Sequence, residues 1–207
     1  MKTIAIALLA LMFTASAFAH PYLRVSAGTS DWDSPAAPVQ GSVPSDLFDD
    51  SQSVAAIAIG AHVTDRFKVE LEYTDFGSGS MAFNDSYQRC FGRRCRNFSD
   101  DHVTDWEAYG VTGWVVYDIY SHGFTDNLRL TLNARGGITR ITMKGTVDDQ
   151  SLKDDDSGVA YGLGADLDIG QHWQANLSWE QHSVQLGSTP NMAYEPEVAK
   201  LGVTYRF

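Results

Sequence analysis

Apolar and polar residues alternate one for one through eight segments of this 207-residue chain. The segment 67–76 shows the pattern most cleanly, because Phe67, Val69 and Leu71 are separated by charged residues. A period of two is the period of a β-strand, whose successive side chains point to opposite faces. The chain is therefore predicted to be all-β, with strands that are apolar on one face and polar on the other.

The expected strands are separated by connections of alternating length. They lie at about 22–29, 53–63, 67–76, 105–117, 128–138, 158–167, 173–182 and 199–207. Short connections alternate with long ones, and the long ones lie at about 31–52, 77–104, 139–157 and 184–196. This alternation is typical of an up-and-down antiparallel barrel whose long loops all emerge at one end. In the ambiguous segment 105–117, we expect the side with Tyr109 and Val111 to face outward and the side with Trp114 to face inward.

Charged residues recur on the polar faces of these strands. They are Arg24, Lys68, Glu70, Glu72, Arg129, Arg135, Asp166, Glu180, Lys200 and Arg206. A soluble barrel would have to bury this set in an apolar core at a large desolvation cost. We therefore predict the inverse arrangement, in which the apolar faces contact lipid and the charges pair inside a narrow lumen filled by side chains. A proton or small-ion path gated by these pairs is the alternative.

The N-terminal residues have the organisation of a secretory signal peptide. Lys2 is followed by the apolar run 4–13 and by the small-x-small site Ala17-Phe18-Ala19. This pattern predicts a cleaved signal peptide at 1–19 and a single barrel domain at 20–207. The rest of the chain lacks an uninterrupted apolar run of about 18 residues, so we expect any membrane crossing to be made by strands.

Charge and cysteine content restrict the possible partners. The net charge of −11 argues against binding to nucleic acid, which needs a basic surface. Cys90 and Cys95 enclose four residues, and in an exported chain they predict a small disulfide loop. A zinc site would need further ligands at suitable spacing, and we expect neither a metal nor another cofactor.

Taken together, these features resemble the small outer-membrane barrels of Gram-negative bacteria. The resemblance includes the Thr64-Asp65-Arg66 turn, the strand that follows it, and the terminal Tyr205-Arg206-Phe207. The group contains the OmpA transmembrane domain, OmpX and the opacity-type surface proteins. It implies an eight-stranded antiparallel transmembrane up-and-down β-barrel, a monomer that contacts outer-membrane lipid and lipopolysaccharide, with both termini at the periplasmic side. It also implies that Tyr205 and Phe207 form the signal read by the outer-membrane insertion machinery.

The resemblance does not specify an activity, because barrels of this shape include adhesins, scaffolds and enzymes. We expect a membrane-structural or adhesin-like role carried by the long loops. The region around the cysteines is a candidate contact for lipopolysaccharide phosphates or an acidic host ligand through Arg89, Arg93, Arg94 and Arg96. The alternative is that this region is only a solubilising loop. Acidic residues gather in the long connections, where we expect a solvated surface, with divalent-cation binding as the alternative.

Catalysis is not expected. Lipid A deacylases of the PagL type use a His and a Ser two residues apart on one strand face, with an acidic residue that orients the His. Here Glu180 and His182 share a face, but Ser183 points to the other one. We keep a lipid A-modifying enzyme and a narrow ion-conducting pore as the alternatives to a surface-interaction protein.

Overall fold

The structure, a computed structural model, describes residues 20–33, 52–91, 94–147, 150–185 and 193–207. The side chains of 80–104 are outside this description. The strands are β1 (Pro21–Asp33), β2 (Gln52–His62), β3 (Phe67–Phe91), β4 (Arg94–Thr125), β5 (Leu128–Val147), β6 (Gln150–Ile169), β7 (Trp173–Gln185) and β8 (Ala193–Arg206). Among the described residues, no helix is both long and apolar enough to cross a bilayer.

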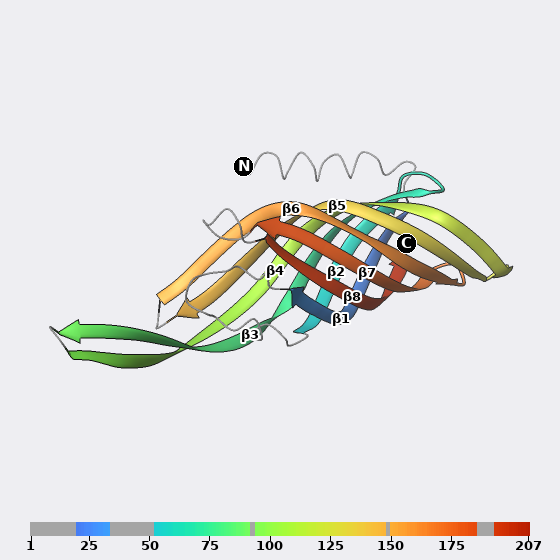
Figure 1. The fold of residues 1–207 in the computed structure, drawn as a ribbon. Coiled ribbons are helices and arrows are strands. Elements are labelled where there is room, and N and C mark those ends of the chain that lie inside the picture. Colours follow the sequence, from blue (N-terminus) through green and yellow to red (C-terminus); the bar gives the residue numbers. More distant parts are fainter. Residues whose placement is uncertain (1–19, 34–51, 92–93, 148–149, 186–192) are drawn as a thin grey trace.

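Each strand pairs antiparallel with its neighbours in sequence, and β8 returns to pair with β1 (Figure 1). The eight strands thereby form a closed up-and-down barrel, which confirms the predicted fold class. The connections at 63–66, 126–127 and 170–172 lie at the same end of the barrel as Pro21 and Phe207, whose backbones are hydrogen-bonded at 3.1 Å. We call this the turn end, and the opposite end the loop end.

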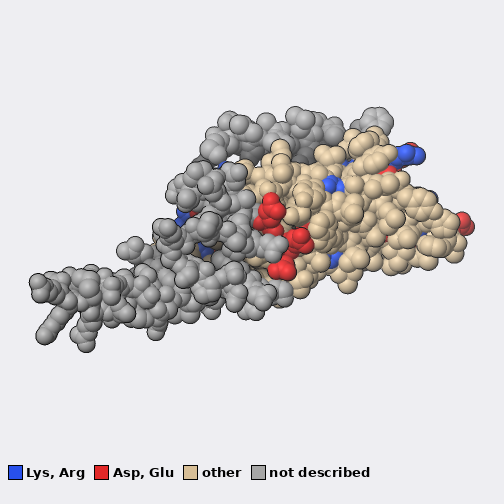
Figure 2. Space-filling model, viewed as in Figure 1, with Lys and Arg blue, Asp and Glu red and all other residues tan. Residues whose placement is uncertain are grey.

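The outer face of the barrel forms an apolar belt, and the side seen in Figure 2 shows few charged residues among those described. Side chains at alternate positions point outward, and the exposed ones include Val25, Ile57, Ile59, Val111, Val115, Leu163, Leu177 and Leu201. Val111 is 45% exposed whereas Trp114 is 2% exposed, which confirms the expected faces of β4. Aromatic rings border the belt at the turn end, where the Trp173 and Tyr205 centroids lie 5.0 Å apart. A belt of this kind is stable in hydrocarbon and would drive aggregation in water.

Several strands continue well past their predicted ends. β3 and β4 stay paired with each other out to Phe91 and Arg94, although β2 pairs with β3 only as far as Asp75 and β5 pairs with β4 only from Thr104. Residues 82–91 and 94–103 therefore form a two-stranded ribbon that projects beyond the barrel (Figure 1). We call it the β3–β4 ribbon.

The prediction of irregular long connections at 77–104 and 139–157 is therefore wrong. Most of 139–157 likewise belongs to β5 and β6, which pair with each other. The error has a physical cause, because strands that leave the membrane no longer need one apolar face, and the alternation that marks a strand fades. β3 separates from β2 beside a β-bulge between Asp75 and Gly77, before the ribbon begins, and Gly77 there has a φ of 93° that only glycine adopts readily.

The lumen has two layers, and the sequence predicted the paired charges of one layer but not the separate apolar layer. Charged side chains occupy the half toward the turn end. Toward the loop end, the interior is filled by buried apolar residues that we call the apolar plug: Trp32, Val54, Phe76, Ala108, Ile141, Val184 and Val198. The ring of Trp32 packs edge-on against Phe76 at a centroid distance of 5.9 Å. Trp32, Ile141, Val184 and Val198 lie outside the predicted strands, so their inward direction was not recognised.

The lipid-facing assignment can be tested at Leu177, which is 57% exposed on the outer face of β7. Leu177→Arg should lower the free energy of unfolding by about 2–4 kcal/mol, because a guanidinium near the bilayer midplane loses its hydration. Urea unfolding of protein refolded in phospholipid vesicles measures this change. Leu177→Ala is the control, since it keeps the face apolar and should cost much less. Equal losses for the two variants would contradict a lipid-facing position.

Candidate functional site

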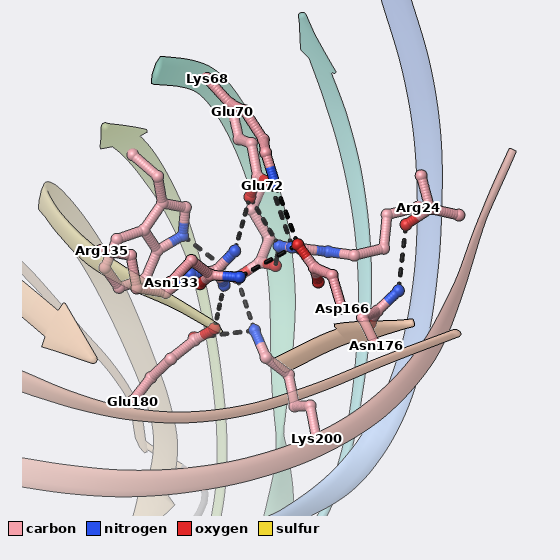
Figure 3. A network of polar contacts seen from close by, with 12 residues as sticks. Arg24, Lys68, Glu70, Glu72, Asn133, Arg135, Asp166, Asn176, Glu180 and Lys200 are labelled. Carbon is pink, nitrogen blue, oxygen red and sulfur yellow. Dashed lines mark hydrogen bonds and ion pairs between the residues drawn. The ribbon is translucent and has the colours of Figure 1, made fainter. Parts of the chain in front are cut away.

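Six charged side chains from five strands converge in the lumen (Figure 3). Each is at most 6% exposed, and they form three cations and three carboxylates: Arg24, Arg135, Lys200, Glu70, Glu72 and Glu180. We call this set the central ion-pair cluster. Its formal charge is zero, so the desolvation of each group is offset by a partner of opposite sign.

Glu72 contacts the largest number of donors in the cluster. Its carboxylate accepts hydrogen bonds from Lys200 Nζ at 2.6 Å and from Arg24 Nη2 at 2.7 Å. Trp114 Nε1 donates to the same carboxylate at 3.4 Å, and the Thr74 hydroxyl donates at 3.2 Å. Buried charged groups need this degree of hydrogen bonding to be tolerated.

Glu70 and Glu180 complete the cluster through Arg135. Arg135 Nη2 donates to Glu70 at 3.0 Å, and its Nη1 donates to Glu180. Lys200 Nζ lies 2.8 Å from the second oxygen of Glu180. The Tyr22 hydroxyl donates to Glu70 at 2.7 Å. Every cation of the cluster thus contacts two carboxylates, so the lumen at this level is tightly cross-linked across strands that are not neighbours.

A second group of ion pairs lies closer to the turn end. Lys68 Nζ is 2.9 Å from Asp166 and 3.0 Å from Asp118. Arg206 Nη1 is 3.1 Å from Asp168. Asp118 and Asp168 lie just outside the predicted strands, so neither was predicted as a lumenal partner. A β-bulge between Asp118 and Tyr120 interrupts the alternation there, whereas continued alternation after Leu167 would have placed Asp168 inward.

The predicted lumenal pairing does not extend to Arg129. Its side chain is exposed at the turn end, and it makes no ion pair within the described part of the chain. The sequence places Arg129 on the inward face of β5 correctly, since it lies opposite Asp168 in the β5–β6 ladder. However, Asp168 is bound by Arg206, and Gln174 also donates to it at 2.9 Å.

His182 is fully buried at the boundary between the central ion-pair cluster and the apolar plug. Its Nε2 lies 3.6 Å from Glu180, and its Nδ1 lies 3.4 Å from the Thr139 hydroxyl. Ser183 does not join this group, because its hydroxyl lies on the other face of β7 and donates to Glu195 at 3.5 Å. His182 and Glu180 therefore come together without a nucleophilic serine from position 183.

Apart from Arg93, the residues predicted to form the surface contact lie in the β3–β4 ribbon. The backbone register places Cys90 opposite Cys95 and Arg89 opposite Arg96, while Arg94 lies opposite Phe91. Directly opposed residues in an antiparallel ladder have the Cα separation that a disulfide requires. Arg93 and the side chains of the ribbon lie outside the described residues, so the disulfide and the ligand contact stay predictions.

The predicted assembly residues lie on the lipid side of β8, at the turn end. Tyr205 is 36% exposed and Phe207 is 69% exposed, and their rings are 5.3 Å apart. Both side chains are thus outside the lumen, where another protein or lipid can contact them.

Comparison with known proteins identifies the architecture. A family model described as outer membrane protein beta-barrel domain matches residues 4–207. The chain is similar in structure to Neisserial surface protein A, with a TM-score of 0.58, 12% identity, and coverage of 91% of this chain and 99% of that one. It is also similar to the N-terminal barrel of Pseudomonas aeruginosa OprF, with a TM-score of 0.52, 12% identity and the same coverage.

A third similar structure is the attachment invasion locus protein Ail of Yersinia pestis. Its TM-score is 0.51 at 14% identity, with coverage of 91% of this chain and 99% of that one. No curated protein sequence gives a significant match. At these identities the solved structures establish the fold and carry no assignment of activity.

The central ion-pair cluster can be tested by removing one charge from it. Glu72→Gln should lower the free energy of unfolding by about 3–5 kcal/mol, because it leaves Arg24 and Lys200 with excess buried positive charge. The matched control is Glu107→Gln, whose partner Lys144 is 2.8 Å away at the exposed surface; this change should cost about 1 kcal/mol or less. Urea unfolding in vesicles measures both. Similar losses of unfolding free energy in the two variants would show that burial does not determine how much these ion pairs contribute to stability.

Proposed function

The chain belongs to the family of outer-membrane β-barrel domains, and we propose that it acts as a surface-interaction protein with a closed lumen. The observation that carries this proposal is the β3–β4 ribbon, which extends past the ends of both neighbouring strands. Among the described residues, the ladder partners of 82–91 and 94–103 come only from the ribbon itself. Such edges offer unpaired backbone N–H and C=O groups to a strand of another protein.

The arginines of the ribbon favour an acidic partner. Arg89 and Arg96 are directly opposed in the ladder, and Arg93 and Arg94 lie beside them in sequence. Like charges at opposed positions destabilise a ladder unless counter-charges are present. In a chain with a net charge of −11, this concentration of arginine is a local exception. Lipopolysaccharide phosphates or an acidic host ligand would supply the missing negative charge through bidentate hydrogen bonds.

The proposed orientation places the loop end outside the cell and the turn end in the periplasm. In this orientation the β3–β4 ribbon reaches the exterior, and Tyr205 and Phe207 lie at the inner interface of the membrane. Export would depend on the signal peptide at 1–19, and Phe207 with Tyr205 would serve the insertion machinery. Two structurally similar proteins are named for surface location or attachment, namely Neisserial surface protein A and Ail. Ail has also been crystallised with the heparin analogue sucrose octasulfate.

Two features support a closed lumen over a narrow pore. The apolar plug contains Phe76 and Ile141, both 0% exposed, and water and ions are disfavoured among such side chains. Beneath it, the central ion-pair cluster fills the interior with hydrogen-bonded groups. We also propose that the protein is not a lipid A-modifying enzyme, because Ser183 lies on the opposite face from His182.

The role of the β3–β4 ribbon can be tested by excising it. Met81 and Thr104 are opposed in the ladder, so an Asn-Gly turn can replace 82–103 without a change of register. The shortened protein should still run on gels as a compact band that shifts when the sample is boiled, which is called heat-modifiability, because the barrel is intact. Binding to lipopolysaccharide or host cells should fall about tenfold or more, equivalent to about 1.4 kcal/mol.

A second variant distinguishes binding through the arginine charges from binding through the backbone edges of the ribbon. Replacing Arg89, Arg93, Arg94 and Arg96 by Gln keeps the ribbon and its edges but removes four positive charges. Loss of binding in this variant as well would identify an acidic ligand, and loss only on excision would identify strand addition. Full binding by the excised protein would overturn the proposal.

The closed lumen predicts the electrical behaviour of the refolded protein. Wild-type protein in planar bilayers should give no steady discrete conductance, because the apolar plug and the central ion-pair cluster occlude the same path. A general porin recorded under identical conditions is the positive control, and a heat-modifiable band from the reconstituted sample verifies folding. Steady unitary currents from the wild type would favour the ion-path alternative instead.

A further inference from the structure

A cavity of about 640 Å³ opens into the lumen at the turn end, on the far side of the central ion-pair cluster from the apolar plug. Cavities of this size are typical of sites for small molecules. Four cationic side chains line it: Arg66, Lys68, Arg129 and Arg206. The carboxylates in its lining are those of Asp65, Asp118 and Asp168. Asp166, which binds Lys68 at 2.9 Å, brings the formal charge around the cavity to zero, in a chain whose net charge is −11.

Two of the four cations are neutralised by the protein itself. Lys68 lies between Asp118 and Asp166, at 3.0 Å and 2.9 Å. Arg206 is paired with Asp168 at 3.1 Å. Asp118 and Asp168 are therefore each bound by a cation other than Arg129.

The other two cations retain most of their hydrogen-bonding capacity. Arg66 donates to the neutral hydroxyl of Tyr117 at 3.5 Å, which is a long hydrogen bond. Arg129 makes no ion pair with any residue that the structure describes, although a guanidinium carries five N–H donors. Arg206 Nε also has no acceptor among the described residues, but this atom is buried and does not open into the cavity. An anion in the cavity would therefore accept hydrogen bonds from Arg129 and Arg66.

The strand beside Arg129 carries no side chain at the paired position that would crowd its guanidinium. Its ladder partner on β4 is Gly123, which lies outside the cavity lining, and a side-chain carbon added at this glycine would meet no atom within 4 Å. β-Bulges at Asp118/Tyr120 and Gly123/Thr125 also disturb this stretch of β4. Bulges are frequent at barrel rims and beside binding sites, where they redirect side chains.

We propose that the turn-end cavity binds a small soluble oxyanion, a phosphate monoester or an organic carboxylate, with Arg129 as its principal contact. The planar guanidinium matches the two oxygens of a carboxylate or phosphate. Arg66 supplies further donors, and the hydroxyls of Ser121 and Thr131, which also line the cavity, contact the polar remainder of the ligand. A soluble anion fits better than a lipid headgroup, because Arg129 belongs to the lumenal face of β5 rather than to the lipid face.

Titration calorimetry on the full chain refolded in a nonionic detergent tests this site. Inorganic phosphate and succinate are titrated at an ionic strength fixed with sodium chloride, and the wild type should bind at least one of them saturably. Arg129→Gln should weaken that binding about tenfold, the effect of losing a charged bidentate contact. The matched control is Arg140→Gln, an equal charge change on β5 at an exposed position outside the cavity, which should leave the affinity unchanged.

Several results would overturn the proposal. These are no saturable binding of either anion above chloride, equal affinity of Arg129→Gln and the wild type, or equal weakening by Arg140→Gln. If Arg129→Gln does not refold, Arg129→Lys keeps the charge without the planar fork and should weaken binding severalfold. Nanodiscs of zwitterionic lipid and of phosphatidylglycerol distinguish the source of the anion. Binding that disappears only in phosphatidylglycerol would assign the cavity to a lipid headgroup and refute a soluble ligand.

Discussion

Closure of β8 onto β1 is the constraint on which the rest of the structure depends. Hydrocarbon offers no partners for backbone N–H and C=O groups, so a membrane-spanning sheet cannot leave an open edge. The β1–β8 ladder runs from Tyr22 opposite Arg206 to Asp33 opposite Glu195, and it closes the barrel without a gap in register. Closure then turns one face of every strand toward lipid and the other toward a narrow interior, which must be filled by the protein's own side chains.

That interior is filled in two different ways. Toward the turn end, the central ion-pair cluster joins three cations with three carboxylates, so buried charge is balanced within the set. Toward the loop end, the apolar plug needs no such balance. His182 lies between them, in contact with Glu180 on one side and with the ring of Phe76 on the other, at a centroid distance of 5.2 Å. The two layers support a structural role for the lumen, which leaves interaction with other molecules to the two ends of the barrel.

Strands could be assigned from the sequence where one face must be apolar, and the assignment failed where a strand extends beyond the apolar belt. Within the bilayer one face of each strand must be apolar, so segments such as 67–76 and 173–182 could be assigned to strands and their faces identified. Beyond the bilayer both faces contact water, and the extension of β3 to Phe91 left no periodic mark. A bulge after Asp118 hid a partner of Lys68 for a related reason, because one extra residue shifts the period and reverses the faces that follow.

The sequence by itself determined how many strands there are and, inside the predicted strands, which residues face lipid and which face the lumen, because a period of two is a local property of the backbone. The tertiary structure decided which lumenal charges meet. Glu72 and Lys200 are 128 residues apart on strands that are not neighbours, and they pair because the closed barrel brings β3 and β8 together across the lumen. The tertiary structure also decided that Arg129 has no carboxylate partner among the described residues. It faces inward as its position in the alternation requires, but Arg206 engages the nearby carboxylate of Asp168, and Arg129 is left facing a cavity.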